Sequence, residues 1–121
     1  MEKLKALLHI DEPNKWHLTL ANTKNFIADA GLEHVTVEIV ANATAVRIFD
    51  SVDKSIDQDV PGLLKQMKEL SENNITIIAC RNALKANSIS EELLPDFVTV
   101  VPAGITRIIS KQAEGYSYVK P

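Results

Sequence analysis

Short apolar runs alternate with amphipathic segments along the whole chain. Four of these runs lack the strict polar alternation of a half-exposed strand, which is typical of strands buried on both faces. They are LKALLHI (4–10), VTVEIVA (35–41), ITIIAC (75–80) and FVTVV (97–101), and YSYV (116–119) is a possible fifth. Because helical patterns separate the runs, the sequence predicts an α/β protein in three layers (α/β/α) with a mainly parallel sheet of five strands.

Turn-forming residues mark the helices between the runs. Pro13 is tolerated in the first turn of a helix that Gly31 closes, and Gly115 stops the last helix. We expect helical segments over residues 11–30, 43–49, 60–72, 81–94 in part, and 105–113. Four aspartates between residues 50 and 59 predict a solvated acidic surface loop rather than a calcium site, because they do not follow the calcium-loop pattern.

Length and composition then narrow the class of protein. A chain of 121 residues, 45% hydrophobic and 24% charged, fits one globular domain spanning residues 1–121. A formal charge of −3 and sparse aromatics exclude a nucleic-acid surface. The N-terminal apolar stretch is too short for a membrane span and lacks a signal-peptide cleavage pattern, so we expect a cytoplasmic protein with no membrane partner.

Candidate chemistry gathers at the carboxyl ends of the predicted strands. Right-handed crossovers bring these ends to one edge of a parallel sheet, where ligands bind. The residues at that edge are His9 to Glu12, Ala41 to Ala43, Cys80 to Asn82, and Val101 to Gly104. Cys80, the only cysteine, is the one nucleophile among them.

Cys80 has two interpretations. If it begins the helix that follows, the helix dipole, Arg81 and Lys85 favour thiolate over thiol and make it reactive. A free cysteine also serves often as a small buried hydrophobe.

Other kinds of site find no support in the pattern. His9, His17 and His34 lie on different elements without a second cysteine, so we expect no metal. No glycine-rich phosphate loop follows a strand, and no cofactor is expected. Of the histidines, only His9 could reach the strand-end crevice. Trp16, Tyr116 and Tyr118 fit the core or a subunit interface better than a binding cage.

Five strings in order give the chain a family resemblance. They are HIDEPNKW (9–16), VANATAV (40–46), ACRNAL (79–84), VVPAGI (100–105) and KQAEGYSYVKP (111–121). Together they resemble the DsrE/DsrF-like family of small intracellular sulfur proteins. The resemblance implies a DsrEFH-like fold, a homotrimer or homohexamer, and a sulfur relay in which a cysteine persulfide is passed to a partner protein. Cys80 matches the position of the sulfur-accepting cysteine, although the following Arg81-Asn82-Ala83-Leu84 differs from the small residues of the relay branch.

These observations lead to three hypotheses. In the first, a sulfur-relay protein accepts sulfane sulfur on Cys80, while Arg81 and helix amides stabilise the anion. Asn42 and Gly104 shape the crevice, and Asn82, His9 and Asp11 are further candidate binding residues at the same edge. The second is a non-catalytic oligomeric scaffold that binds a small ligand in that crevice. The third, a thiol-dependent hydrolase, requires a base beside Cys80.

Overall fold

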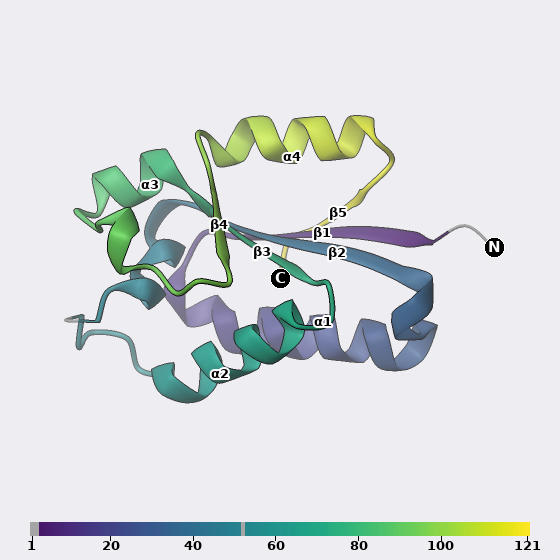
Figure 1. Cartoon of the computed structure of the whole chain (residues 1–121), viewed down its shortest axis with the longest axis horizontal. Helices are drawn as coiled ribbons and strands as arrows, with labels where there is room; N and C mark the ends of the chain where they lie inside the picture. The colour runs from purple at the N-terminus through teal and green to yellow at the C-terminus, as the bar shows by residue number, and fades with distance from the viewer. Residues whose placement is uncertain (1–2, 52) are drawn as a thin grey trace.

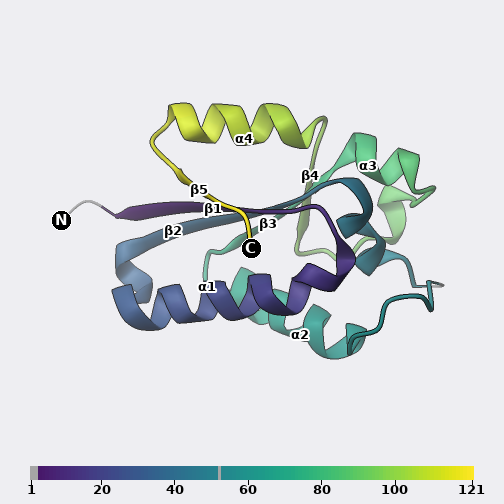
Figure 2. The same ribbon diagram turned by 180° about the vertical axis from the view of Figure 1, so that it is seen from behind.

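Five parallel strands form one sheet in the order β4-β3-β2-β1-β5. The structure is a computed structural model, and it describes residues 3–51 and 53–121. The strands are β1 (Leu4–Ile10), β2 (Val35–Ala41), β3 (Thr76–Cys80), β4 (Val98–Val101) and β5 (Ser117–Val119). All four pairings are parallel, and the fifth strand that the sequence only suggested lies at the edge beside β1 (Figure 2).

Helices cover both faces of this sheet, but unequally. The α-helices are α1 (Trp16–Ala30), α2 (Val60–Ser71), α3 (Arg81–Ala86) and α4 (Gly104–Ala113). Short 3-10 helices are η1 (Pro13–Lys15), η2 (Leu32–His34), η3 (Ala43–Phe49) and η4 (Glu91–Leu93). Figure 1 shows α1 and α2 below the sheet and α4 alone above it, with α3 at one end. The predicted three-layer α/β/α class is confirmed.

Residues with positive φ angles follow α1, α2 and α4, close to the helix ends that the sequence predicts. Gly31 follows α1 with φ 93° and donates its N–H to the Ile27 carbonyl, and Gly115 follows α4 with φ 94°. Asn74, after α2, adopts φ 66°. These backbone angles favour glycine or asparagine, which is why those residues mark the chain reversals.

The acidic loop is exposed at Asp57 and Asp59, as the sequence predicts, but Asp53 is shielded. The Asp53 carboxylate is almost buried and accepts from Arg47 Nε at 2.8 Å. Hydrogen bonds from Ser55 are the main cause that lowers the pKa of Asp53. The Asp59 side chain accepts from the Gly62 N–H at 3.2 Å and so caps α2. Asp53 and Asp59 therefore have identified structural partners.

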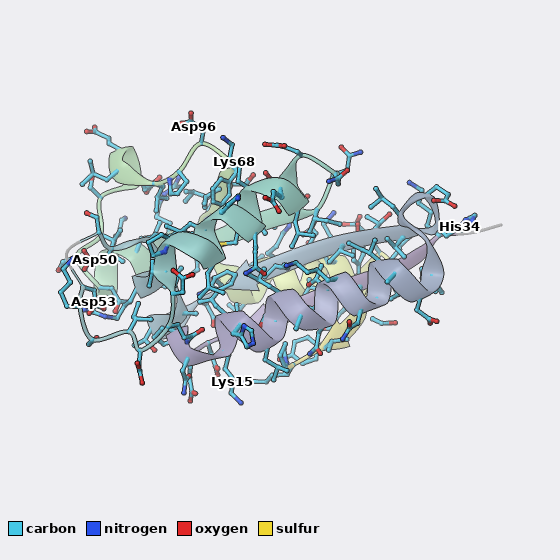
Figure 3. The ribbon with its side chains drawn as sticks, turned by 90° about the horizontal axis from the view of Figure 1, so that it is seen from below. Lys15, His34, Asp50, Asp53, Lys68 and Asp96 are labelled. Atoms are coloured by element: carbon cyan, nitrogen blue, oxygen red, sulfur yellow. The ribbon has the colours of Figure 1, made fainter. Side chains whose placement is uncertain are left out.

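The lower layer encloses the larger apolar core. Trp16, at the start of α1, is fully buried and donates its indole N–H to the Ala45 carbonyl at 2.9 Å. Phe49 meets the same indole edge-on, with ring centroids 6.0 Å apart. In Figure 3, which views the molecule from below, α1 and α2 run side by side in front of the sheet. Apolar packing of α1 and α2 thus stabilises the lower face of the sheet.

The upper layer combines a small apolar cluster with an ion pair between a buried carboxylate and a half-buried arginine. Ile108 of α4 packs among residues of four strands, which are Leu7, Val40, Ile78 and Val101. Beside them the Glu38 carboxylate accepts from Arg107 Nε at 2.9 Å and from Arg107 Nη2 at 2.8 Å. The hydrogen bond to Glu38 is the main cause that raises the pKa of Arg107. This bidentate pair fixes α4 across the middle of β2.

The helices that the structure describes include none long and apolar enough to span a bilayer.

Candidate functional site at the carboxyl edge of the sheet

The carboxyl ends of the central strands carry a row of polar side chains. Ile10 pairs with Ala41, and Ala41 pairs with Ala79, so the next residues on these strands are Asp11, Asn42 and Cys80. Side chains alternate along a strand, which places Cys80 on the same upper face as Ile78 and Asn42 on the same face as Val40. The register therefore brings three of the predicted site residues to one edge.

Gly104, the first residue of α4, closes over this row. A Cβ at Gly104 would lie 3.3 Å from the Cys80 Cβ and 3.4 Å from the Asn42 Cβ. Only a residue without a side chain fits this approach comfortably. The residue before it, Ala103, supplies no side-chain cap, so the first turn of α4 brings uncapped N–H groups to this end of the sheet. Cys80, Asn42 and Gly104 come together as the sequence analysis expected.

Cys80 is the last residue of β3 and immediately precedes α3. It is 6% exposed and also contacts the larger apolar core. Its side chain makes no capping bond to α3, which is only six residues long. Asn82, two residues further along the chain, is exposed, so Cys80 lies where the chain passes from the core to the surface.

Arg81 is held by a carboxylate. Its Nε donates to Glu91 Oε2 at 2.7 Å, and its Nη2 donates to Glu91 Oε1 at 3.1 Å. The hydrogen bond from Arg81 is the main cause that lowers the pKa of Glu91, and the same bond raises the pKa of Arg81. The Arg81 guanidinium, which the sequence predicted as a stabiliser of the Cys80 thiolate, thus forms an ion pair with Glu91.

His9 connects three strands through hydrogen bonds at both ring nitrogens. Nδ1 lies 2.6 Å from the Tyr118 hydroxyl of β5, and Nε2 lies 2.9 Å from Oδ1 of Asn42 after β2. The rings of His9 and Tyr118 are tilted, with centroids 5.6 Å apart. Tyr118 was expected in the core or at an interface, and no sequence pattern indicates that its hydroxyl meets His9.

Asp11 pairs with a second residue of the C-terminal segment. Lys120 Nζ donates to Asp11 Oδ2 at 2.9 Å. This hydrogen bond is the main cause that lowers the pKa of Asp11 and raises the pKa of Lys120. Residues 118–120 therefore attach to the end of β1 at two points.

The remaining predicted residues stand apart from this network. Asn82 is exposed, and its side chain forms no hydrogen bond with the residues that the structure describes. His34 lies at the end of the molecule opposite Asp50 and Asp53 (Figure 3). Within the described ranges, no group of three or more His, Cys, Asp or Glu side chains is placed to hold a metal ion.

The fold and the site together define a class, that of small parallel α/β proteins with a lone cysteine at the carboxyl edge of the sheet. The chain belongs to the DsrE/DsrF-like family, whose sequence profile matches residues 13–121. This confirms the family that the five sequence strings indicated.

Two solved structures are similar over nearly the whole chain. MTH1491 from Methanobacterium thermoautotrophicum, a protein of unknown function, is 30% identical with a TM-score of 0.79, and the match covers 98% of this chain and 100% of that one. The ychN protein from E. coli is 11% identical with a TM-score of 0.67 and full coverage of both chains, which shows a shared fold alone. No curated protein matches the sequence.

Proposed function

We propose that this protein is a sulfur-relay component that accepts sulfane sulfur on Cys80 as a persulfide and passes it to a partner. The observation that carries the proposal is the position of Cys80. It ends a central parallel strand, and its Cβ lies 3.3 Å from the Cβ position of Gly104. Membership of the DsrE/DsrF-like family supports a sulfur-relay role for a cysteine at this edge.

The proposed chemistry is two successive exchanges at divalent sulfur. The Cys80 thiolate attacks the outer sulfur of a donor persulfide, the donor's S–S bond breaks, and the donor leaves as a thiol after taking up a proton. The new S–S bond on Cys80 then undergoes the same attack by an acceptor thiolate, and Cys80 is released as thiolate. One sulfur atom moves in each step with no external oxidant or reductant and no cofactor.

Cys80 is the only cysteine, so the resolving thiol must come from another molecule. This requirement fits a relay between donor and acceptor proteins better than a self-contained redox cycle. Following the family resemblance, we propose that the protein works in the cytoplasm as a homotrimer or homohexamer.

Mass spectrometry of the intact protein tests the relay. After incubation with inorganic polysulfide and removal of excess reagent, wild type should gain the mass of one or more sulfur atoms, and a reductant should remove it. Cys80→Ser keeps a side chain of similar shape and should gain nothing. Absence of added sulfur on wild type, with thermal unfolding showing a folded protein, would contradict the proposal.

The low exposure of Cys80 favours a second candidate function. At 6% exposure the Cys80 thiol can simply line the wall of the strand-end crevice. His9, Asn42 and Tyr118 form their hydrogen-bond network without it. In that case the strand-end crevice would bind a small ligand, and the stabilisation that the ligand gives would survive Cys80→Ser. A thermal-shift series with small carboxylates and inorganic anions on both proteins distinguishes this scaffold from the relay.

The geometry gives no comparable support to a thiol hydrolase. Such an enzyme needs a base bonded to its nucleophile. In the part of the chain that the structure describes, His9 directs both ring nitrogens to Tyr118 and Asn42, and no histidine bonds to Cys80.

A further inference from the structure

The hydrogen bonds of His9 determine where its proton resides. Oδ1 of Asn42 can only accept, so the 2.9 Å contact places the proton on His9 Nε2. A neutral imidazole then has an acceptor at Nδ1, and the Tyr118 hydroxyl must donate across the 2.6 Å contact. The network therefore runs in one direction, from Tyr118 through His9 to Asn42.

The Asn42 amide presents its oxygen and its nitrogen to different surroundings. With Oδ1 held by His9, the amide nitrogen Nδ2 points to the other side of the same planar group. Nδ2 forms no hydrogen bond with any residue in the ranges 3–51 and 53–121. It is also not a buried unsatisfied atom, because the structure contains none among its described side chains. Asn42 thus has two N–H donors available to a ligand at an accessible position.

Cys80 is the neighbour that these donors can serve. Asn42 and Cys80 follow a register pair on adjacent strands, which are about 4.8 Å apart in a sheet. Both Cβ atoms lie within 3.4 Å of the Cβ position of Gly104. No hydrogen bond joins the Asn42 amide to the neutral Cys80 thiol among the described residues, but the negative charge of a thiolate or of the terminal sulfur of a persulfide attracts a neighbouring N–H donor.

We infer that Tyr118 is a positioning residue, which acts through His9 to hold the Asn42 amide where it donates to anionic sulfur on Cys80. The inference rests on the proposed function and deepens it, because it assigns the recognition of the anionic sulfur to an amide rather than to the guanidinium of Arg81. It also gives the C-terminal strand a role in the site.

The test removes the hydroxyl oxygen of Tyr118. Tyr118→Phe keeps the ring on β5 and deletes the donor to His9. In wild type, nitrogen NMR of the imidazole should show His9 as the Nε2–H tautomer, and Tyr118→Phe should show a mixture. The rate of sulfur loading from polysulfide should fall about fivefold, the scale of one lost hydrogen bond. Tyr116→Phe is the matched control, because the Tyr116 hydroxyl forms no hydrogen bond with the described residues. It should change neither the His9 tautomer nor the rate of sulfur loading.

A second variant acts directly on the donor. Asn42→Asp keeps the acceptor for His9 but replaces the N–H groups with a charged oxygen beside Cys80. It should slow sulfur loading more than Tyr118→Phe does. Loading at the wild-type rate in both variants would overturn the inference while leaving the relay intact.

Alkylation of Cys80 by iodoacetamide separates this inference from the proposed function. If wild type takes up no sulfur, the relay fails, but the positioning role still predicts slower alkylation in Tyr118→Phe and Asn42→Asp than in wild type and Tyr116→Phe. Equal alkylation rates in all four proteins, or an Nδ1–H tautomer of His9 in wild type, would overturn the positioning role whether or not the relay survives.

Discussion

The two faces of the sheet are built from different interactions. The lower face packs against α1 and α2 through a continuous apolar core around Trp16 and Met67. The upper face is covered by α4 alone and holds the Glu38–Arg107 ion pair, with the His9 network at its carboxyl end. Figure 1 shows this asymmetry, with α1 and α2 below the sheet and α4 above it.

The difference separates what holds the fold from what forms the site. Apolar packing is non-directional, so the lower face supplies stability without specifying where polar groups point. Hydrogen bonds and ion pairs are directional, so the upper face can set α4 and the Asn42 amide at defined positions. Damage to the lower face should lower stability, whereas damage near the carboxyl end of the upper face should change the reactivity of Cys80.

The largest expected loss comes from the lower face. Trp16→Ala removes a fully buried indole and its hydrogen bond to Ala45, and should lower the free energy of unfolding by about 4 kcal/mol. Trp16→Phe keeps most of the apolar volume and should lose less. Urea unfolding followed by circular dichroism measures both, since the chain has no other tryptophan for fluorescence. Equal losses in the two variants would show that volume does not set the stability of this face.

The second largest loss of stability is expected when the Glu38–Arg107 ion pair of the upper face is broken. Arg107→Met leaves the Glu38 carboxylate, 5% exposed, with Lys111 at 3.5 Å as its one remaining ion-pair partner among the described residues, and should lower the free energy of unfolding by about 3 kcal/mol. The double variant Glu38→Leu with Arg107→Met removes both charges and should recover most of that loss. A double-mutant cycle from urea unfolding measures the coupling, and additive effects would contradict the structural role given to this pair.

The sequence predicted the elements well because each depends on local pattern. The apolar run 35–41 became β2 with its expected bounds, since burial on both faces favours a continuous apolar strand. Gly31 and Gly115 ended their helices because their φ angles favour glycine. Glu38 was a further signal, since a charged residue inside such a run requires a buried partner, but no spacing rule identifies Arg107, 69 positions away, as that partner.

The sequence predicted where the site lies, but not which side chains form hydrogen bonds there. The strand ends of Asn42, Cys80 and Gly104 meet because parallel strands share one edge. Arg81 was expected to serve Cys80 from its place in the sequence, but side-chain direction depends on competing partners, and Glu91 lies ten residues further on. Tyr118 reaches His9 across 109 positions because β5 pairs with β1, and that strand order depends on contacts that no local pattern encodes.

The smallest stability effect, and the sharpest comparison of stability with reactivity, comes from two glycines. In Gly104→Ala the new Cβ would lie 3.3 Å from the Cys80 Cβ, which can give way only through a small shift of the strand or helix backbone, so the free energy of unfolding should fall by about 1 kcal/mol. The same methyl group crowds the crevice, and alkylation of Cys80 by iodoacetamide should slow several-fold. Gly115→Ala should lower stability by a similar amount, about 1 kcal/mol, because its φ of 94° strains any other residue, but its surroundings are open and Cys80 should be unaffected. If both variants lost stability and neither altered the thiol, the approach of α4 to Cys80 would be packing alone.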